Sequence, residues 1–435
     1  MPVQFRKKAT YRFAITTATV GLWLFQAGQA SAAPVPAPLG VIPVQCSGHA
    51  LSAAVASAPP SSVLALAAGC TYLLARGLPT IDDTLDLQGP ATIALGLSGG
   101  HGGSILTVGG GGNVTTDQVS FTGGDPPGKG GRGGAIDNEG GTVQVNFGSF
   151  SHNIVSGDGG AIYNSGGLLK VFRAKFSDNN ALQGGAIENF GTASVTGASF
   201  AMNTAAAFGG AIQNEGTASI HSSTFRSNTA YSGGGVYNKN GTLSILGSRF
   251  TANQAAFDAA TVPKDDTDEP PAGAGVANKA RLTLKSDSFE GNGGGTTTFK
   301  GGAVYNDGTA TLADSVLSGN HAVAGGGLYN DATATASHDT IKANRTTHDG
   351  GGIYNFGHLA ISATRIRRNH AGLDGGGLLN GAFVRISGSQ FYGNFAGKGG
   401  GGIHDYYSLR LTSTTFRDNT PDNCESRLGA KGCAR

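Results

Sequence analysis

One pattern recurs eleven times between Gly133 and Asn419 and limits the possible folds more than any other feature. Each copy begins with Gly-Gly, a small residue, an aliphatic residue, a variable residue and Asn, which is replaced by Asp405 in the last copy. A large apolar residue followed by x-x-Asn comes about a dozen residues later, and most copies follow one another at intervals of 24 or 25 residues. Such a short unit cannot bury its apolar face alone, so the copies must stack into a solenoid.

Three short strands with their turns use about 25 residues, which predicts that each copy forms one coil of a right-handed parallel β-helix. We therefore expect one elongated all-β domain of about 11 regular coils, preceded by degenerate N-terminal coils and a short capping helix. The aliphatic and Phe positions should form interior stacks. Most of the 74 glycines should lie at coil turns, where a Cβ would hinder the backbone.

The recurrent Asn residues are predicted to be structural. An amide side chain can bond the backbone of its own turn and the amide of the next coil, which produces a ladder. A catalytic residue has no reason to recur in every coil. The first members of the two ladders are Asn138, Asn164, Asn189 and Asn214 in one, and Asn153, Asn179, Asn203 and Asn228 in the other.

The start of the sequence has the order of a secretory signal peptide. Basic residues precede the apolar run FAITTATVGLWLF and then AGQASAAP, which predicts cleavage after Ala32. An uncleaved anchor is the alternative, but the run is shorter than the roughly 20 residues of a spanning helix. The expected divisions are a signal peptide at 1–32, a Pro/Ala-rich linker at 33–45, an N-terminal cap with degenerate coils at 46–121, the repeat β-helix at 122–419 with an insertion at 254–273, and a disulfide-closed cap at 420–435.

Loss of the signal peptide changes the formal charge of the chain from +2 to −2, because the removed segment carries four basic residues and no acid. No basic stripe is visible in the sequence, so nucleic acid is not expected as a partner. We also expect no membrane span after cleavage, no cofactor, and a monomer. The ten His residues show no metal-ligand spacing, and no metal site is predicted.

Four cysteines, Cys46, Cys70, Cys424 and Cys433, lie near the two ends of the predicted solenoid. An exported chain with an even number of cysteines suggests disulfides. A disulfide needs Cα atoms within about 7 Å, so the fold permits only the pairs Cys46–Cys70 and Cys424–Cys433. A zinc site is the alternative, although no C-x-x-C occurs. Helical spacing of apolar residues in SGHALSAAVASA, with Ser47 as N-cap, predicts the capping helix.

The paired GGAIYN and FxxN segments resemble the repeat of polymorphic outer membrane proteins. The stretch CSGHALSAAVASAPPSSVLALAAGCTYLL and the ending NTPDNCESRLGAKGC resemble those of secreted bacterial right-handed β-helix proteins of the pectin-lyase-like superfamily. The resemblance implies a surface or secreted protein, often with an adhesive role. The sequence departs from autotransporter members because it ends at Arg435, directly after the coils, so an outer-membrane location is not expected.

The residue between the interior aliphatic and the Asn should point outward by strand alternation. This predicted stripe contains Asp137 and Glu188, about 10 Å apart on coils that are two steps apart, as the candidate catalytic pair of a polysaccharide lyase or glycoside hydrolase. It also contains Tyr305, Tyr329 and Tyr354 on successive coils, which could stack on a sugar chain or a protein partner. The alternative is that these rings pack on one another.

Two insertions interrupt the period at the same corner of adjacent coils, QAAFDAATVPKDDTDEPPAGA and GGGTTTFKG, and should project side by side. The larger one carries the acidic candidate binding residues Asp265, Asp266, Asp268 and Glu269. Insertions on one side of a solenoid often mark its binding side, and a loop without function is the alternative.

These features predict a secreted or cell-surface β-helical protein, non-enzymatic, that acts in adhesion or in binding a polysaccharide or surface protein. A pectate-lyase-like enzyme is the alternative function. A structural role in the cell envelope is a third.

Overall fold

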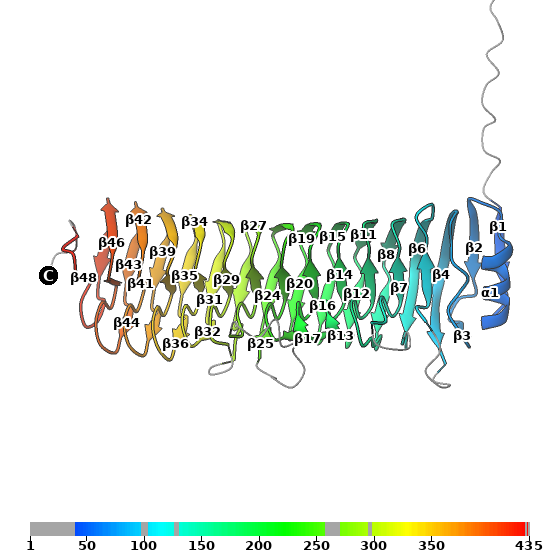
Figure 1. Ribbon diagram of the computed structural model, residues 1–435, viewed down its shortest axis with the longest axis horizontal. Helices are drawn as coiled ribbons and strands as arrows, with labels where there is room; N and C mark the ends of the chain where they lie inside the picture. Colours follow the sequence, from blue (N-terminus) through cyan, green and yellow to red (C-terminus); the bar gives the residue numbers. More distant parts are fainter. Residues whose placement is uncertain are drawn as a thin grey trace, which may run out of the picture. The chain divides into compact units, whose positions relative to one another are not determined.

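The structure, a computed structural model, describes residues 40–96, 103–125, 130–256, 270–294, 298–430 and 433 of the 435-residue chain. From Gly40 on, the described chain forms a parallel β-solenoid of about 14 turns, with one short helix near its start (Figure 1). The predicted parallel β-helix is confirmed. There are more turns than the 11 regular copies because the irregular segments before and after them also coil. The proposed signal peptide lies outside the described residues.

A 27-stranded sheet contributes two strands to each regular coil, a strand of five residues followed by one of three. The five-residue strands are β8 Thr142–Asn146, β11 Leu168–Phe172, β15 Thr192–Thr196, β19 Thr217–His221, β23 Thr242–Leu246, β27 Arg281–Lys285, β30 Thr309–Ala313, β34 Thr333–Ser337, β38 His358–Ser362, β42 Phe383–Ser387 and β46 Ser408–Thr412. The three-residue strands are β9 Ser149–Ser151, β12 Lys175–Ser177, β16 Ser199–Ala201, β20 Thr224–Arg226, β24 Arg249–Thr251, β28 Ser288–Glu290, β31 Val316–Ser318, β35 Thr340–Lys342, β39 Arg365–Arg367, β43 Gln390–Tyr392 and β47 Thr415–Arg417.

A 13-stranded sheet closes the opposite side of the coils; its strands from β7 to β41 carry the first Asn of each repeat, β45 carries Asp405, and β5 and β48 flank them. These are β5 Leu106–Val108, β7 Ile136–Asn138, β10 Ile162–Asn164, β14 Ile187–Asn189, β18 Ile212–Asn214, β22 Val236–Asn238, β26 Val276–Asn278, β29 Val304–Asn306, β33 Leu328–Asn330, β37 Ile353–Asn355, β41 Leu378–Asn380, β45 Ile403–Asp405 and β48 Cys424–Ser426. Two four-stranded sheets complete the wall: β13 Asn180–Gln183, β17 Thr204–Phe208, β21 Thr229–Ala230 and β25 Gln254–Ala255; and β32 His321–Ala322, β36 Arg345–Thr346, β40 His370–Ala371 and β44 Phe395–Ala396.

The N-terminal end is closed by the predicted helix, α1 Gly48–Ser57, whose N-cap Ser47 accepts a hydrogen bond from the Ala50 amide at 3.1 Å. Leu51 is its buried contact with the core. The remaining strands of this region are β1 Val41–Val44, β2 Ser62–Leu66, β3 Thr71–Leu74, β4 Thr84–Leu95 and β6 Asn113–Thr122. Strand β1 falls within residues 33–45, which the sequence predicts to be a linker. The segment forms a strand because it pairs in parallel with β2 and extends the 27-stranded sheet.

The interior core is continuous along the coils. Its most regular part is a column of Phe rings, stacked with centroids 4.5–5.2 Å apart, from Phe121 to Phe289. Leu317, Ile341 and Ile366 continue the same column before it returns to Phe391. Because identical positions pair in register, each coil buries the apolar face of the next.

Both predicted Asn ladders are present. In the 13-stranded sheet, Asn138 Nδ2 donates to Asn164 Oδ1 at 2.7 Å, and the pattern continues from coil to coil to Asp405. In the second ladder, Asn228 Oδ1 accepts from both the backbone amide and Nδ2 of Asn203, while its own Nδ2 reaches the Phe200 carbonyl and Asn253. The amides thus satisfy one another and the turns inside the wall, which confirms the structural interpretation.

The Gly-Gly pair turns the chain tightly into each strand of the 13-stranded sheet. Gly184 has φ +59°, and a Cβ on it would overlap the carbonyl oxygen of Ile187. A Cβ on Gly185 would overlap the carbonyl of Gly210 in the next coil. The first glycine therefore provides a left-handed conformation and the second provides close contact between coils.

Both predicted disulfides are confirmed. Cys46–Cys70 joins the segment before α1 to the start of β3, with Cα atoms 5.7 Å apart. Cys424–Cys433 ties β48 to the end of the chain, with Cα atoms 5.2 Å apart. Each disulfide holds one end of the solenoid, as the spacing of the cysteines predicts.

We predict that Asn228→Ala lowers the free energy of unfolding by about 2–4 kcal/mol, because the amide groups of Asn203 and the carbonyl of Phe200 lose buried partners. Chemical denaturation followed by circular dichroism measures this. The control Thr217→Ala, on the exposed face of β19, should change it by no more than about 0.5 kcal/mol. Equal effects of the two substitutions would contradict the ladder's role.

Two acids occupy a buried row that carries Ser or Thr in the neighbouring coils. Asp287 Oδ1 accepts from the Ser248 amide at 2.7 Å, and Asp339 Oδ1 accepts from the Ser315 amide at 2.7 Å. Burial outweighs these hydrogen bonds and raises the pKa of each carboxyl to about 7. The folded state therefore binds more protons than the unfolded state between about pH 4 and pH 7, so these residues make stability fall as the pH rises through that window.

We predict that Asp287→Ser and Asp339→Ser, which restore the residue type of adjacent coils, raise the free energy of unfolding at pH 8 by about 1–3 kcal/mol. At pH 4 the gain should vanish, because both carboxyls are then neutral. Urea denaturation at the two pH values distinguishes this from a general packing effect. A gain of the same size at both pH values would refute the titration argument.

Candidate functional site

The stripe predicted to face solvent is covered instead. Tyr305 is 2% exposed and Tyr329 8% exposed, and Tyr354 is half-buried. Strand alternation places these rings on the outer side of the 13-stranded sheet, as expected, but the segment before each Gly-Gly folds back over them. At Gly325 the backbone comes so close that a Cβ would overlap the Cβ of Tyr329. The prediction of exposed tyrosines is therefore wrong.

Below this cover lies a second apolar cluster, separate from the interior core. It joins Phe208 and Tyr231 of the covering segments to Tyr237, Tyr305 and Tyr329 of the sheet. The Tyr329 and Tyr354 rings stack at 4.6 Å with an interplanar angle of 10°. Lys300 lies over the Tyr305 and Tyr329 rings and pairs with Asp331 at 3.0 Å. The arrangement corresponds to the alternative in which the tyrosines pack on one another.

The candidate catalytic pair lies on the same sheet, where Glu188 is buried and Asp137 is partly exposed. Asp137 and Glu188 flank Tyr163 in register, so they are two coils apart as predicted. Burial, reinforced by nearby Glu139, raises the pKa of Asp137 to about 6. Burial raises the pKa of Glu188 well above its ordinary value, with Asp158 and Glu215 adding to the shift.

Glu188 is fully buried, and neither of its carboxyl oxygens has a hydrogen-bond partner among the described residues. Tyr163 separates it from Asp137, and Arg132 lies over the Tyr163 ring at 4.8 Å from its centroid. The structure thus places the two acids two coils apart on one sheet, with Glu188 closed to a polymer substrate and Asp137 partly exposed.

The predicted acidic binding residues Asp265, Asp266, Asp268 and Glu269 lie outside the described residues. The described bases of the two insertions do meet, because the Phe299 amide donates to the Pro271 carbonyl at 2.9 Å. Thr298 anchors the second insertion through a bond from its hydroxyl to the Ala255 carbonyl at 2.8 Å.

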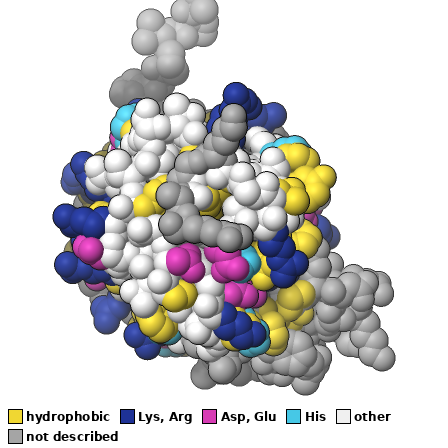
Figure 2. Space-filling model, turned by 90° about the vertical axis from the view of Figure 1, so that its left-hand side faces the viewer, with side chains coloured by type: hydrophobic (Ala, Val, Ile, Leu, Met, Phe, Trp, Pro, Cys, Tyr) yellow, Lys and Arg dark blue, Asp and Glu magenta, His cyan; other side chains and the backbone are white. Residues whose placement is uncertain are grey.

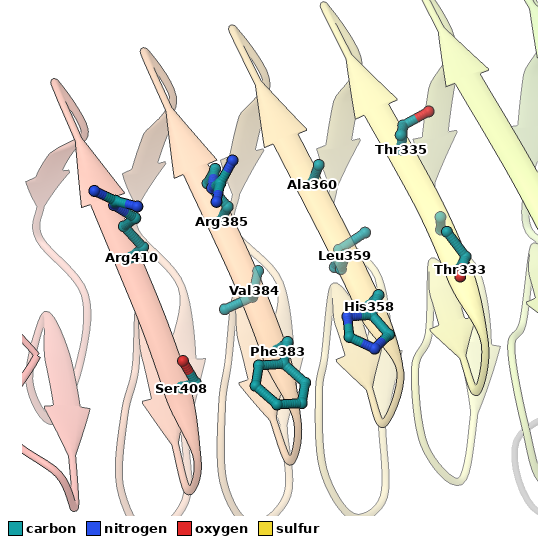
Figure 3. A pocket seen from close by; sticks show the side chains of 11 residues that line it. Thr333, Thr335, His358, Leu359, Ala360, Phe383, Val384, Arg385, Ser408 and Arg410 are labelled. Atoms are coloured by element: carbon teal, nitrogen blue, oxygen red, sulfur yellow. The ribbon is translucent and has the colours of Figure 1, made fainter.

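An open groove of about 440 Å³ lies on the other side of the solenoid, over β34, β38, β42 and β46 of the 27-stranded sheet (Figure 3). Figure 3 shows His358 and Phe383 side by side on adjacent strands, and Arg385 and Arg410 as a second pair next to them. Thr333, Thr335 and Ser408 add hydroxyl groups to the lining. No carboxylate lines this groove in the described structure.

The groove presents exposed rings on a rigid surface. His358 and Phe383 stack with centroids 4.9 Å apart and an interplanar angle of 3°, and Tyr407 meets the edge of Phe383 at 4.9 Å. Phe383 is 44% exposed and Tyr407 51% exposed. Arg385 and Arg410 are register partners on β42 and β46. The groove can therefore combine stacking with several hydrogen-bond donors.

The expectation that the chain lacks a basic stripe is also wrong. In the strands of the 27-stranded sheet from β8 to β47, strand alternation turns the basic side chains outward. Among the described residues of these strands, Glu290 is the acidic one. Viewed from the C-terminal end, most visible Lys and Arg side chains lie at the rim, and a group of carboxylates lies nearer the middle (Figure 2). The basic residues are far apart in the sequence, and only the coiling brings them to one face.

The groove residues lie outside the predicted outward stripe, because that stripe follows the 13-stranded sheet and the groove lies on the 27-stranded sheet. The alternation of side chains in FVRIS and SLRLT does indicate them, because Phe383, Arg385 and Arg410 fall on outward positions of the five-residue strands.

In the part of the chain that the structure describes, no group of three or more His, Cys, Asp or Glu could hold a metal ion. Within those same residues, no helix has the length and apolar character to cross a membrane.

Comparison with known proteins finds one family model that matches a copy of the repeat. Residues 148–165 match the model of the Chlamydia polymorphic membrane protein repeat. No curated protein matches this sequence. Among solved structures, PfbA, a surface adhesin of Streptococcus pneumoniae, is similar with a TM-score of 0.40 and 12% identity over 89% of this chain and 92% of PfbA.

Two further solved structures have lower TM-scores. ORF18 of Geobacillus virus E2 has a TM-score of 0.21 and 11% identity over 89% of this chain and 60% of its own. The alginate lyase AlyGC of the PL6 family has a TM-score of 0.17 and 10% identity over 90% of this chain and 98% of its own. The chain is thus a parallel β-solenoid that carries a polymorphic membrane protein repeat.

Proposed function

We propose that this protein acts outside the cell as a non-enzymatic, adhesin-like protein that binds a polysaccharide in the groove over β34, β38, β42 and β46. The observation that supports this best is the exposed ring pair His358 and Phe383 beside the arginine pair Arg385 and Arg410. All four side chains come from strands of a continuous sheet, so their positions are set before a ligand binds.

The chemistry of the groove suits a sugar chain. Exposed aromatic rings offer a flat apolar surface to the C–H face of a sugar. The guanidinium groups and the hydroxyls of Thr333, Thr335 and Ser408 can hydrogen-bond the sugar hydroxyls around it. The groove is open along the coil axis, which allows a polymer to extend past the lining residues.

An extracellular location is supported by independent features. Both disulfides of the structure require an oxidising compartment to persist. The N-terminal sequence has the order of a secretory signal peptide. The polymorphic membrane protein repeat at 148–165 belongs to a family named for membrane-associated proteins.

A polysaccharide-cleaving enzyme is the second candidate function, and one observation favours it. Asp137 and Glu188 are close in space and both have raised pKa values, as a general acid requires. They lie on the opposite sheet from the groove, and Glu188 is fully buried there. If the chain were such an enzyme, it would release products from a polysaccharide, and Glu188→Gln would abolish the release.

We predict that Phe383→Ala weakens binding to a glycan found on an array at least about tenfold, because a stacked ring contributes about 1–3 kcal/mol. Calorimetric titration measures the affinity. The control is Phe172→Ala, which removes an equally exposed ring from β11, several coils away. Neither ring is in the core, so both variants should melt close to the wild-type temperature. Unchanged affinity of Phe383→Ala would remove the groove from the proposal.

A further inference from the structure

The two large sheets of the solenoid differ in charge. Among the described strand residues of the 27-stranded sheet from β8 to β47, Glu290 is acidic, and it pairs with Arg249. The basic residues of these strands are Lys170, Lys175, Arg226, Arg249, Arg281, Lys285, Lys342, Arg365, Arg367, Arg385, Arg410 and Arg417. The strands of the 13-stranded sheet carry acids such as Asp137 and Glu188 and, as described, no Lys or Arg. The near-neutral chain therefore has a distinctly basic side.

The basic residues are most concentrated next to the groove. Lys342, Arg367, Tyr392 and Arg417 occupy the same position on β35, β39, β43 and β47, so they form a continuous row across four coils. The row follows the groove one strand further around the coil. Arg367 and Arg417 each lie 5.8 Å from the centroid of the Tyr392 ring, on the two sides of it.

Little in this region neutralises that charge. Arg417 contacts Asp418 at 3.2 Å, but both side chains are about three-quarters exposed, and such a pair contributes little in water. The neighbouring Asp339 is buried, and burial raises its pKa to about 7, so its carboxyl is only partly ionised at neutral pH and does not reach the surface. The row and the arginine pair of the groove thus form one basic surface, which runs along the coil axis.

Such a surface is matched by a chain with regularly spaced anionic groups. Guanidinium groups bind carboxylate, sulfate and phosphate with two parallel hydrogen bonds. Adjacent coils are about 4.8 Å apart, so charges repeat along the axis at the spacing of the strands. Between them lie rings and hydroxyl groups, which suit sugars. No described helix or ribbon projects from this face to enter a groove of duplex DNA, as sequence-reading proteins require.

We propose that the polysaccharide is a polyanion whose carboxylate or sulfate groups lie on the row Lys342, Arg367 and Arg417 as well as on Arg385 and Arg410. This inference rests on the proposed function, because it names the class of sugar chain that the groove takes. It also predicts an extended ligand that spans several coils rather than a single sugar.

The test compares dextran sulfate with uncharged dextran of equal chain length, both immobilised for surface plasmon resonance. We expect dextran sulfate to bind at least about 100-fold more tightly at low salt, with an affinity that falls steeply as salt rises. Arg367→Gln should weaken this binding about tenfold, the effect of one charge-assisted contact. The matched control is Arg226→Gln, which removes the same charge from the same strand position on β20, five coils away along the solenoid.

The outcomes separate this inference from the proposed function. Equal, salt-insensitive binding of the two dextrans would overturn the polyanion and leave polysaccharide binding intact. If neither dextran binds but a glycan array is positive, the polyanion is overturned and polysaccharide binding stands. If the glycan array is also negative, both the polyanion and polysaccharide binding are overturned. Duplex DNA that binds as tightly as dextran sulfate, and loses affinity equally in Arg367→Gln, would overturn the assignment to a polysaccharide. If Arg226→Gln loses as much affinity for dextran sulfate as Arg367→Gln, only the total charge of the protein matters, and the assignment is overturned as well.

Discussion

Parallel pairing of identical positions from coil to coil is the constraint on which the rest of the structure depends. It places Asn138 on Asn164 and Phe150 on Phe176, so that in such pairs an amide bonds an amide and a ring stacks on a ring. The amides are fully buried, and their bonds need that register, since a shift of one residue would expose them and leave their partners unpaired. Stability therefore resides in contacts between neighbours, and the surface residues are free to vary between coils.

The outer surfaces differ between the two sides of the solenoid. Over the 13-stranded sheet, covering segments add a second apolar layer that packs on Tyr237, Tyr305 and Tyr329. Glu188 of the same sheet is fully buried. The 27-stranded sheet carries no such cover in the described coils, and its outward side chains meet solvent. The exposed basic rows and the groove are consequences of the absence of a cover.

Much of the fold could be read from the repeat because its physical requirements are local. Gly184 needs a left-handed turn, Ser47 caps a helix, and the cysteines can pair only at the ends of a rod. The site could not be read in the same way. Strand alternation correctly predicts that the Tyr329 side chain lies on the outer side of its sheet, but it cannot predict whether another segment covers that side. For the same reason Phe383, one of many residues at an outward strand position, did not stand out in the sequence.

By itself, the sequence determined the coil, its interior stacks, the amide ladders and the closed ends, because each of these is dictated by residue type at a fixed spacing. The tertiary structure alone decided which outward positions meet solvent and which charges gather together. Lys342, Arg367 and Arg417 are separated by tens of residues along the chain, yet they share one row because each turn of the solenoid returns the backbone to the same side. Burial and electrostatic potential depend on distances in space, and these exist only once the coils have stacked.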